Sequence, residues 1–324
     1  MFKRITVLAS VLFCAQALTT LAANPKELPA ETKWVLNLDM KAAQTAPMLT
    51  FVADKMAPEK RQEAENKLAA IKAMFGVDLL KDIDQVVIAG TGNAEKGGVA
   101  YVYGTFDVQR LTTILAGSKN FASTQYGAFT ILGWNDDGQK YVSFAKPGIA
   151  LLTNSQTALN DALDVLGGKK PGLAGDSVFA YAFARTGQEL LTVQAVDVPN
   201  IVGEQPKAQA LKQAQSLCLR VSAASPEELT AALSVTASSD ETATQIQQAL
   251  MGIQALTLLR ANEEPESASL ASLAKVAVQG RTVSVTVTLP KSTIENIMRL
   301  RQQREAAKAA QPAAPAAAAP AATN

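Results

Sequence analysis

The chain has 324 residues, 48% of them apolar and 18% charged, which excludes collagen-like and wholly disordered proteins. Its 30 basic and 29 acidic residues leave a net charge of +1, which excludes the strong field of a protein that binds polyanions. Histidine is missing, and with it the most common general base and metal ligand. The length allows one large domain or two of roughly 130–150 residues.

The first 23 residues predict a secretory signal peptide. Lys3 and Arg4 precede an apolar run over residues 5–18, and small residues then lead to a cleavage site after Ala22 or Ala23. We therefore expect export through the inner membrane, to the periplasm or out of the cell. Removal of the two basic residues of the signal leaves a mature net charge of −1.

Two alternatives to a cleaved signal are less well supported by the residues. An uncleaved anchor needs an apolar run of about 20 residues, and this run is shorter. Lipidation of Cys14 needs a small residue before it, and Phe13 stands there. No later segment is long and apolar enough to span a membrane, so the mature protein is expected to be soluble.

Residues 24–168 predict a first α+β unit. Alternating apolar and polar side chains indicate strands, and apolar residues three or four apart indicate helices. The expected elements are a strand at 34–40, helices over 42–75, strands at 84–90 and 98–106, a helix capped by Asp107, strands at 129–134, 141–145 and 149–153, and a helix at 155–166.

Residues 169–176 form a predicted linker, which continues the glycine- and proline-rich stretch that begins at Gly167. A second α+β unit is expected over residues 177–301. Its elements are a strand at 178–184, a mixed and partly helical segment at 188–215, strands at 217–223 and 229–237, a long helix from Asp240, strands at 275–278 and 281–289, and a helix from Lys291. The order of elements repeats that of the first unit, so an internal duplication is predicted.

The fold class follows from the strand pattern. Val283, Val285 and Val287 alternate with Ser and Thr, as in an antiparallel sheet with one apolar face. We therefore predict an α+β protein made of two similar two-layer units, each an antiparallel sheet with helices on one face. The face of small polar residues is either ordinary solvated surface or a flat surface for recognition or subunit packing.

Cys218 is the only cysteine of the predicted mature chain, so no internal disulfide is expected. It is either a buried small side chain or a route to an intermolecular bridge. The strand pattern places Cys218 and Arg220 together on the outward side, which weakens the prediction of burial.

The last segment, residues 302–324, is rich in Ala and contains Pro312, Pro315 and Pro320. These prolines interrupt any helix, and nothing large is present to bury, so a disordered tail is predicted. The tail is either a tether across an envelope layer or a solubilising segment.

Two short motifs resemble sites of phosphate binding and of serine chemistry. Gly90-Thr91-Gly92 follows a strand, but another strand rather than a helix comes next, so a hairpin turn is expected. Ser272 and Lys275 match the Ser-x-x-Lys motif of penicillin-binding proteins, yet the Ser-Asp-Asn and Lys-Thr-Gly elements are absent.

Carboxylates are the remaining candidates for acid–base chemistry. A hydrolase of this kind needs two acids that face each other in one cleft. The paired candidates stand beside turns or caps, where a backbone role is the ordinary one. The candidates are Asp39, Asp82 with Asp84, Asp136 with Asp137, and Glu263 with Glu264.

Basic residues do not form the stripe that nucleic-acid binding requires. Lys169 and Lys170 are only a pair, and acidic neighbours offset Arg299, Arg301 and Arg304. We therefore expect no nucleic-acid partner. With one thiol and no histidine we also expect no metal, no cofactor and no catalytic residue.

Residues 75–83 before a strand, and residues 150–154 before an amphipathic helix, resemble segments of exported bacterial proteins known only as domains of unknown function. The resemblance covers most of residues 34–300 in general pattern and includes no specific motif. It implies export and provides no active site.

These observations favour an exported, non-enzymatic binding or scaffold protein of the bacterial cell envelope. Its partner would be an envelope protein or a cell-wall component, and homodimers remain open. One alternative is a periplasmic carrier of an apolar small molecule or lipid, with Met251 and Leu258 of the 240–259 helix lining the cavity. The other is a carboxylate-based hydrolase.

Overall fold

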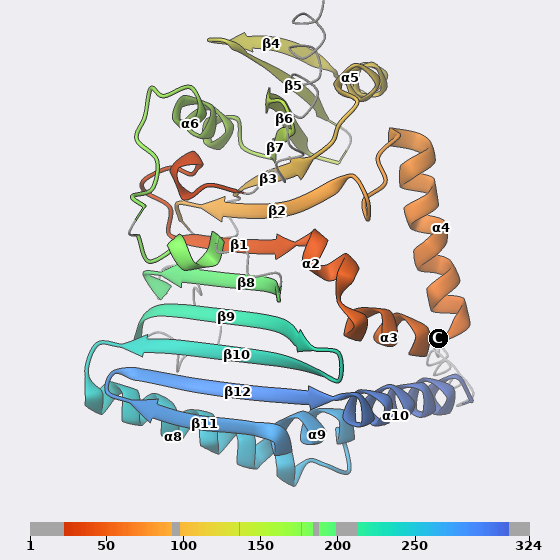
Figure 1. Ribbon diagram of the computed structural model, residues 1–324, viewed down its shortest axis with the longest axis vertical. Helices are drawn as coiled ribbons and strands as arrows, with labels where there is room; N and C mark the ends of the chain where they lie inside the picture. The colour runs from red at the N-terminus through yellow and green to blue at the C-terminus, as the bar shows by residue number, and fades with distance from the viewer. Residues whose placement is uncertain are drawn as a thin grey trace, which may run out of the picture.

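Twelve strands form one continuous antiparallel sheet in this computed structural model, which describes residues 23–92, 98–135, 137–175, 177–183, 188–198 and 213–310 (Figure 1). The strands, in chain order, are β1 (Trp34–Asp39), β2 (Ile83–Gly90), β3 (Val99–Gly104), β4 (Ala122–Tyr126), β5 (Phe129–Asn135), β6 (Gln139–Lys146), β7 (Ile149–Thr153), β8 (Glu189–Val196), β9 (Ala214–Ser225), β10 (Glu228–Ala237), β11 (Ala274–Gln279) and β12 (Thr282–Pro290). Their order across the sheet is β11-β12-β10-β9-β8-β1-β2-β3-β7-β6-β5-β4.

Eight α-helices and two short 3₁₀ helices accompany the sheet in the described residues. The α-helices are α2 (Met40–Thr45), α3 (Pro47–Lys55), α4 (Pro58–Phe75), α5 (Val108–Ala116), α6 (Gln156–Leu166), α8 (Asp240–Leu259), α9 (Pro265–Leu273) and α10 (Lys291–Ala310). The 3₁₀ helices are η1 (Pro25–Glu27) and η3 (Ala180–Phe183). Among the described residues, no helix has the length and hydropathy needed to cross a membrane.

The α+β class is confirmed, but the described residues give no evidence of two repeated units. Strand β1 pairs with β2 on one edge and with β8 on the other, so the two halves of the chain share one sheet. Side-chain alternation identifies strands but carries no information about which strand edges meet. Both edges of β1 offer unpaired backbone groups, and β8 satisfies one of them.

The region around β8 differs most from the sequence-based expectation. In place of the strand expected at 178–184, the described residues form a turn followed by the 3₁₀ helix η3. The strand comes later, at Glu189–Val196, inside the segment expected to be mixed and partly helical. Residues 199–212 lie outside the described chain. Pairing with β1 and β9 on its two edges stabilises β8, and this non-local pairing outweighs local propensity.

One face of the sheet packs against α6, and we call it the α6 face. Val87, Tyr101 and Leu151 lie directly opposite one another across β2, β3 and β7 and are fully buried. Leu159 and Leu163 of α6 belong to the same apolar cluster. An apolar core of described residues therefore lies between these strands and α6, which Figure 1 shows beside this end of the sheet.

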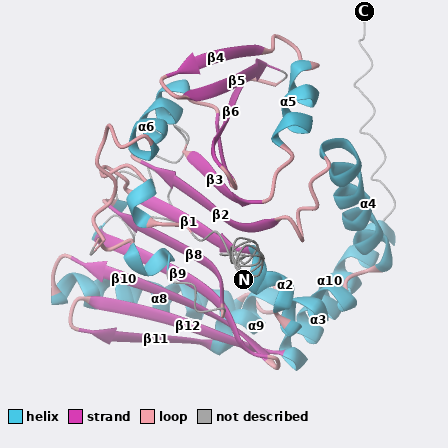
Figure 2. Cartoon of the chain, turned by 45° about the horizontal axis from the view of Figure 1, so that its top comes forward, coloured by secondary structure: helices cyan, strands magenta, loops and turns pink. Residues whose placement is uncertain are grey.

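The opposite face packs against α8, and we call it the α8 face. Val235 of β10 and Val283 of β12 pair directly and share a cluster with Ala243 and Ile246 of α8. Figure 2 shows that α4 and α5 lie on this same side of the sheet, near its other end.

Helices thus cover both faces of the first half, where the sequence predicted one. The physical reason is that strands such as β3 are apolar on both faces: Tyr101 points to α6, and its neighbour Val102 points to the other side. A strand that is apolar on both faces must be covered twice.

Candidate functional site

An apolar pocket lies on the α8 face, between the sheet and helices α4 and α5. It has a volume of about 330 Å³, and every residue that lines it is aliphatic or aromatic. The helices and the connecting segments contribute Ile71, Phe75, Val77, Leu79, Phe106, Leu111 and Leu115, and the strands contribute Ile83, Val102, Trp134, Val142, Phe144, Ala150 and Leu152.

The end of α4 gives the pocket one of its walls. Gly76 ends the helix with a φ of 71°, a left-handed conformation that glycine adopts without strain. The Arg110 guanidinium lies so close to Gly76 that an added Cβ would be 2.8 Å from it, and it donates a hydrogen bond to the carbonyl oxygen of Ala73 (3.0 Å). Arg110 thereby ties α5 to the last turn of α4.

The turn after Gly76 carries Val77 and Leu79 into the pocket. The Asp78 N–H donates to the Asp82 carboxylate (2.7 Å), and the Asp78 carboxylate accepts from the N–H of Leu80 (3.2 Å). Lys72 donates to the same Asp78 carboxylate (3.0 Å), and this hydrogen bond lowers the pKa of Asp78. Polar groups on the outside of the turn therefore hold its apolar side chains against the sheet.

Aromatic side chains make the inner end of the pocket. The rings of Phe106 and Phe144 have centroids 6.3 Å apart and planes inclined by 52°, a tilted arrangement within the range of centroid distances of interacting aromatic pairs. Leu152 keeps 38% of its surface exposed although it lines the pocket. Apolar surface is thus left in contact with solvent at this site.

A second cavity of about 230 Å³ lies near the first turn of α6 and is lined by hydroxyl-bearing and apolar residues together with one carboxylate, Asp161. The hydroxyl of Tyr101 is buried there without a hydrogen-bond partner among the described residues. Burial raises the pKa of Tyr101 strongly, so its hydroxyl stays protonated.

The predicted carboxylate pairs lie in local structure rather than in either cavity. Asp39 caps α2 by accepting from the N–H of Ala42 (2.9 Å), and Asp84 pairs with Lys41 (2.9 Å). Asp82 holds the turn described above. Asp137, Glu263 and Glu264 are exposed, and Asp136 lies outside the described residues.

The two motif candidates also serve local structure. Gly90 and Gly92 stand beside Trp34: an added Cβ at Gly90 would be 2.5 Å from the indole, whose N–H donates to the carbonyl oxygen of Gly92 (2.8 Å). The Ser272 hydroxyl donates to the carbonyl oxygen of Ser269 (2.8 Å), and Lys275 is exposed in β11.

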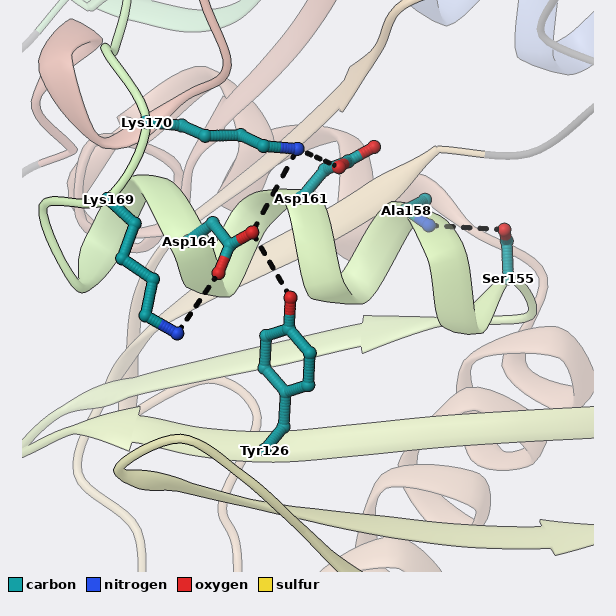
Figure 3. Close-up of polar contacts among 7 residues, drawn as sticks. All are labelled: Tyr126, Ser155, Ala158, Asp161, Asp164, Lys169 and Lys170. Atoms are coloured by element: carbon teal, nitrogen blue, oxygen red, sulfur yellow. Dashed lines mark hydrogen bonds and ion pairs between the residues drawn. The ribbon is translucent and has the colours of Figure 1, made fainter.

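The basic pair of the predicted linker is bound to α6 (Figure 3). Lys170 lies 2.6 Å from Asp161 and 3.9 Å from Asp164, and Lys169 lies 3.6 Å from Asp164. The Tyr126 hydroxyl donates to the same Asp164 carboxylate (3.1 Å). These lysines are therefore paired with the helix that precedes them.

The other basic candidates lie on α10. Arg304 contacts Glu266 (3.4 Å) and the carbonyl oxygen of Glu263 (3.0 Å), and Arg299 contacts Asn296 (2.7 Å). Arg301 is exposed. In the described chain, no group of three or more His, Cys, Asp or Glu is placed to hold a metal ion.

The sequence left open whether Cys218 is buried, and it suggested Met251 and Leu258 as lining residues of a ligand cavity. Cys218 is half-buried in β9, and burial raises the pKa of its thiol. Met251 and Leu258 are exposed on α8 and do not line the apolar pocket. The pocket residues themselves, such as Leu111 and Leu115, carried only the helical apolar stripe that any packed helix shows.

Comparison with known proteins identifies a fold and no family. No family model matches the chain, and no curated protein matches it. Crystal form III of TP0453 from Treponema pallidum is similar, with a TM-score of 0.50 and 12% identity over 86% of this chain and 98% of that one. Crystal forms IV and I of the same protein give TM-scores of 0.46 and 0.47 with 11% and 12% identity, and each match covers 86% of this chain and 97% of the other. The chain therefore has a fold like that of TP0453.

Proposed function

We propose that this chain is an exported, non-enzymatic binding protein of the bacterial cell envelope that carries an apolar small molecule or acyl chain. The apolar pocket between the sheet, α4 and α5 is the observation that supports this function. The signal-like N-terminus supports export. The fold likeness to TP0453, an envelope-associated protein of unknown function, agrees with an envelope location.

The size and lining of the pocket suit an alkyl or aromatic ligand. Its volume of about 330 Å³ is at the lower end of the range of roughly 300–1,000 Å³ for small-molecule sites. Each methylene removed from water contributes about 0.8 kcal/mol, so an eight-carbon chain would contribute roughly 6 kcal/mol before the cost of association. A charged ligand would find no partner on the lining side chains and would lose its hydration.

The pocket supports a carrier better than the two other candidate functions. A hydrolase needs two facing acids, but among the described candidate carboxylates Asp39 caps α2, Asp82 holds a turn and Asp84 pairs with Lys41, and the others lie exposed. A scaffold protein needs a partner surface, and it has no use for an open apolar cavity. Scaffold and carrier roles still differ in one measurable respect, which is a bound small molecule.

Trp134 offers a direct test because it lines the pocket, and Trp34 is the only other tryptophan. We would titrate the mature protein with a naphthylamine probe that accepts energy from tryptophan. Saturable transfer is expected in the parent and in Trp34→Phe, and a lower transfer efficiency at saturation is expected in Trp134→Phe, whose remaining donor, Trp34, lies outside the lining. Native mass spectrometry of protein recovered from its own envelope would then identify the natural ligand.

A filled pocket supplies the matched control. Leu115→Trp in α5 should block the probe, whereas Val108→Trp on the same helix, at an exposed position outside the lining, should leave binding intact. Equal binding by both variants, or no saturable transfer in the parent, would refute the carrier function.

A further inference from the structure

A chain of buried hydrogen bonds begins at Ala23, the first described residue. The Ala23 N–H donates to Gln85 Oε1 (2.9 Å), and Gln85 Nε2 donates to Asn37 Oδ1 (2.8 Å). Asn37 Nδ2 in turn donates to the carbonyl oxygen of Ala182 in η3 (2.6 Å). Gln85 is fully buried, and Ala23 and Asn37 are only 7% and 6% exposed. The N–H of Ala23 therefore belongs to a buried hydrogen-bond network that connects β2, β1 and η3.

A buried carboxylate stands beside this nitrogen's acceptor. Asp39 of β1 lies directly opposite Gln85 of β2, and it is only 5% exposed. Directly opposed residues point to the same face, with Cβ atoms about 4.5–5.5 Å apart. The hydrogen bond from Gln85 to Asn37, two residues before Asp39, confirms that these polar side chains share one face. Asp39, which also accepts from the N–H of Ala42, would give a cationic nitrogen at Ala23 an opposite charge on the same face, and a neutral amide cannot make that pairing.

We propose that the predicted signal peptide is cleaved between Ala22 and Ala23, and that the new α-ammonium group of Ala23 docks on Gln85 and Asp39. In the cleavage, water adds across the peptide bond: Ala22 leaves with a carboxylate, and the nitrogen of Ala23 is released as an amine and takes up a proton. This inference rests on the predicted signal peptide and is independent of the apolar pocket.

The two adjacent cleavage positions have different consequences for the fold. Cleavage after Ala23 would remove the donor to Gln85 and leave its buried Oε1 without a partner, which is costly. That cut would also place Leu21 three residues before the scissile bond, where a small residue is preferred, whereas cleavage after Ala22 places Thr20 there. An uncleaved chain would present a neutral amide at Ala23, which donates its one hydrogen to Gln85 and brings no positive charge to the face that Asp39 shares.

The first measurement is the intact mass of the protein recovered after export from a bacterial host. We expect a chain that begins at Ala23. A chain that begins at Asn24, or at any residue before Ala23, would overturn the proposed cleavage site.

The second measurement tests the docked ammonium. Two mature forms are released from a cleavable tag, one that begins at Ala23 and one with a single glycine added before it. The glycine keeps an N–H at Ala23 but moves the charge away, and it should lower the folding equilibrium constant about tenfold, the usual value of a hydrogen bond to a charged group.

Two matched variants distinguish Asp39 from acids nearby. In Asp39→Asn the cost of the added glycine should shrink to below about threefold, because the charge pairing is already lost. In Asp84→Asn it should stay near tenfold, since Asp84 adjoins Gln85 in β2 but pairs with Lys41. The same cost in Asp39→Asn as in the parent would refute the pairing, whatever the intact mass shows and whether or not the pocket binds a ligand.

Discussion

Replacement of the single residue Leu152 tests the proposed function. It lines the apolar pocket and keeps 38% of its surface exposed, so its replacement changes the pocket more than the core. We predict that Leu152→Asp weakens binding of the apolar probe by more than about tenfold, because a carboxylate there must be desolvated by the ligand. The loss of folding stability should stay near about 1 kcal/mol.

Fluorescence titration and urea unfolding of the same preparations would measure both effects. Val178→Asp is the control, since Val178 is 56% exposed and lies outside the pocket lining. Unchanged probe affinity in Leu152→Asp would mean that the probe binds elsewhere.

A second prediction for a single residue concerns Asp78 and the pH dependence of folding stability. Lys72 lowers the pKa of Asp78 below the ordinary value of 3.8, so the folded state favours the ionised carboxylate. This contribution is fully present above the ordinary pKa and is lost as the pH falls through the lowered one. Asp78→Asn should therefore be less stable than the parent at pH 7, and the difference should shrink below about pH 4.

Urea midpoints of parent and variant at pH 7 and pH 3 would check this expectation. A difference that grows toward low pH would contradict the assigned role of Lys72.

Helix α4 has no buried residue, and polar contacts hold its last turn. Arg110 of α5 holds its last turn through the carbonyl oxygen of Ala73 and the space above Gly76. We predict that Arg110→Ala costs about 1 kcal/mol of stability and speeds amide hydrogen exchange in the last turn of α4. Probe binding should weaken as well, since Ile71 and Phe75 line the pocket from this turn.

Gln109→Ala is the matched control on the same helix, because the Gln109 side chain is exposed. Hydrogen exchange resolved by peptide would show the effect. Equal exchange in both variants would show that Arg110 does not hold α4.

The shared sheet makes a prediction for the whole molecule. The strands of the second half and those of the first half form two neighbouring blocks of one unbroken sheet from β11 to β4, and the pairing of β1 with β8 joins the blocks. We expect the two tryptophans, Trp34 in β1 and Trp134 in β5, to report one cooperative unfolding transition.

Urea unfolding of Trp34→Phe and Trp134→Phe would follow each reporter alone. Circular dichroism would follow the same samples. Within each variant, the urea midpoint measured by fluorescence should coincide with the midpoint measured by circular dichroism. Separate midpoints would favour two independently folding units, as the sequence pattern suggested.

Local pattern alone determined many elements of this protein. Asp107 caps α5 as predicted, and α4 ends before Gly76, at the limit of the predicted helical segment 42–75. Both depend on a few adjacent residues, through side-chain capping and a left-handed glycine. The alternation of Val283 and its neighbours correctly identified β12 and its apolar face. The sequence analysis did not predict the exposed edge strand β4, because its three central residues are all polar and show no alternation.

Tertiary structure decided what depends on contacts between distant segments. The pairing of β1 with β8 joined two expected sheets into one, because backbone hydrogen bonding between strands is independent of side-chain pattern. The pocket likewise depends on how α4 and α5 meet the sheet, and its residues look in sequence like any packed core. The sequence alone showed that histidine is absent and that the N-terminus is signal-like. Only the packing of the elements shows where apolar surface is left uncovered, because a cavity is a property of the space between them.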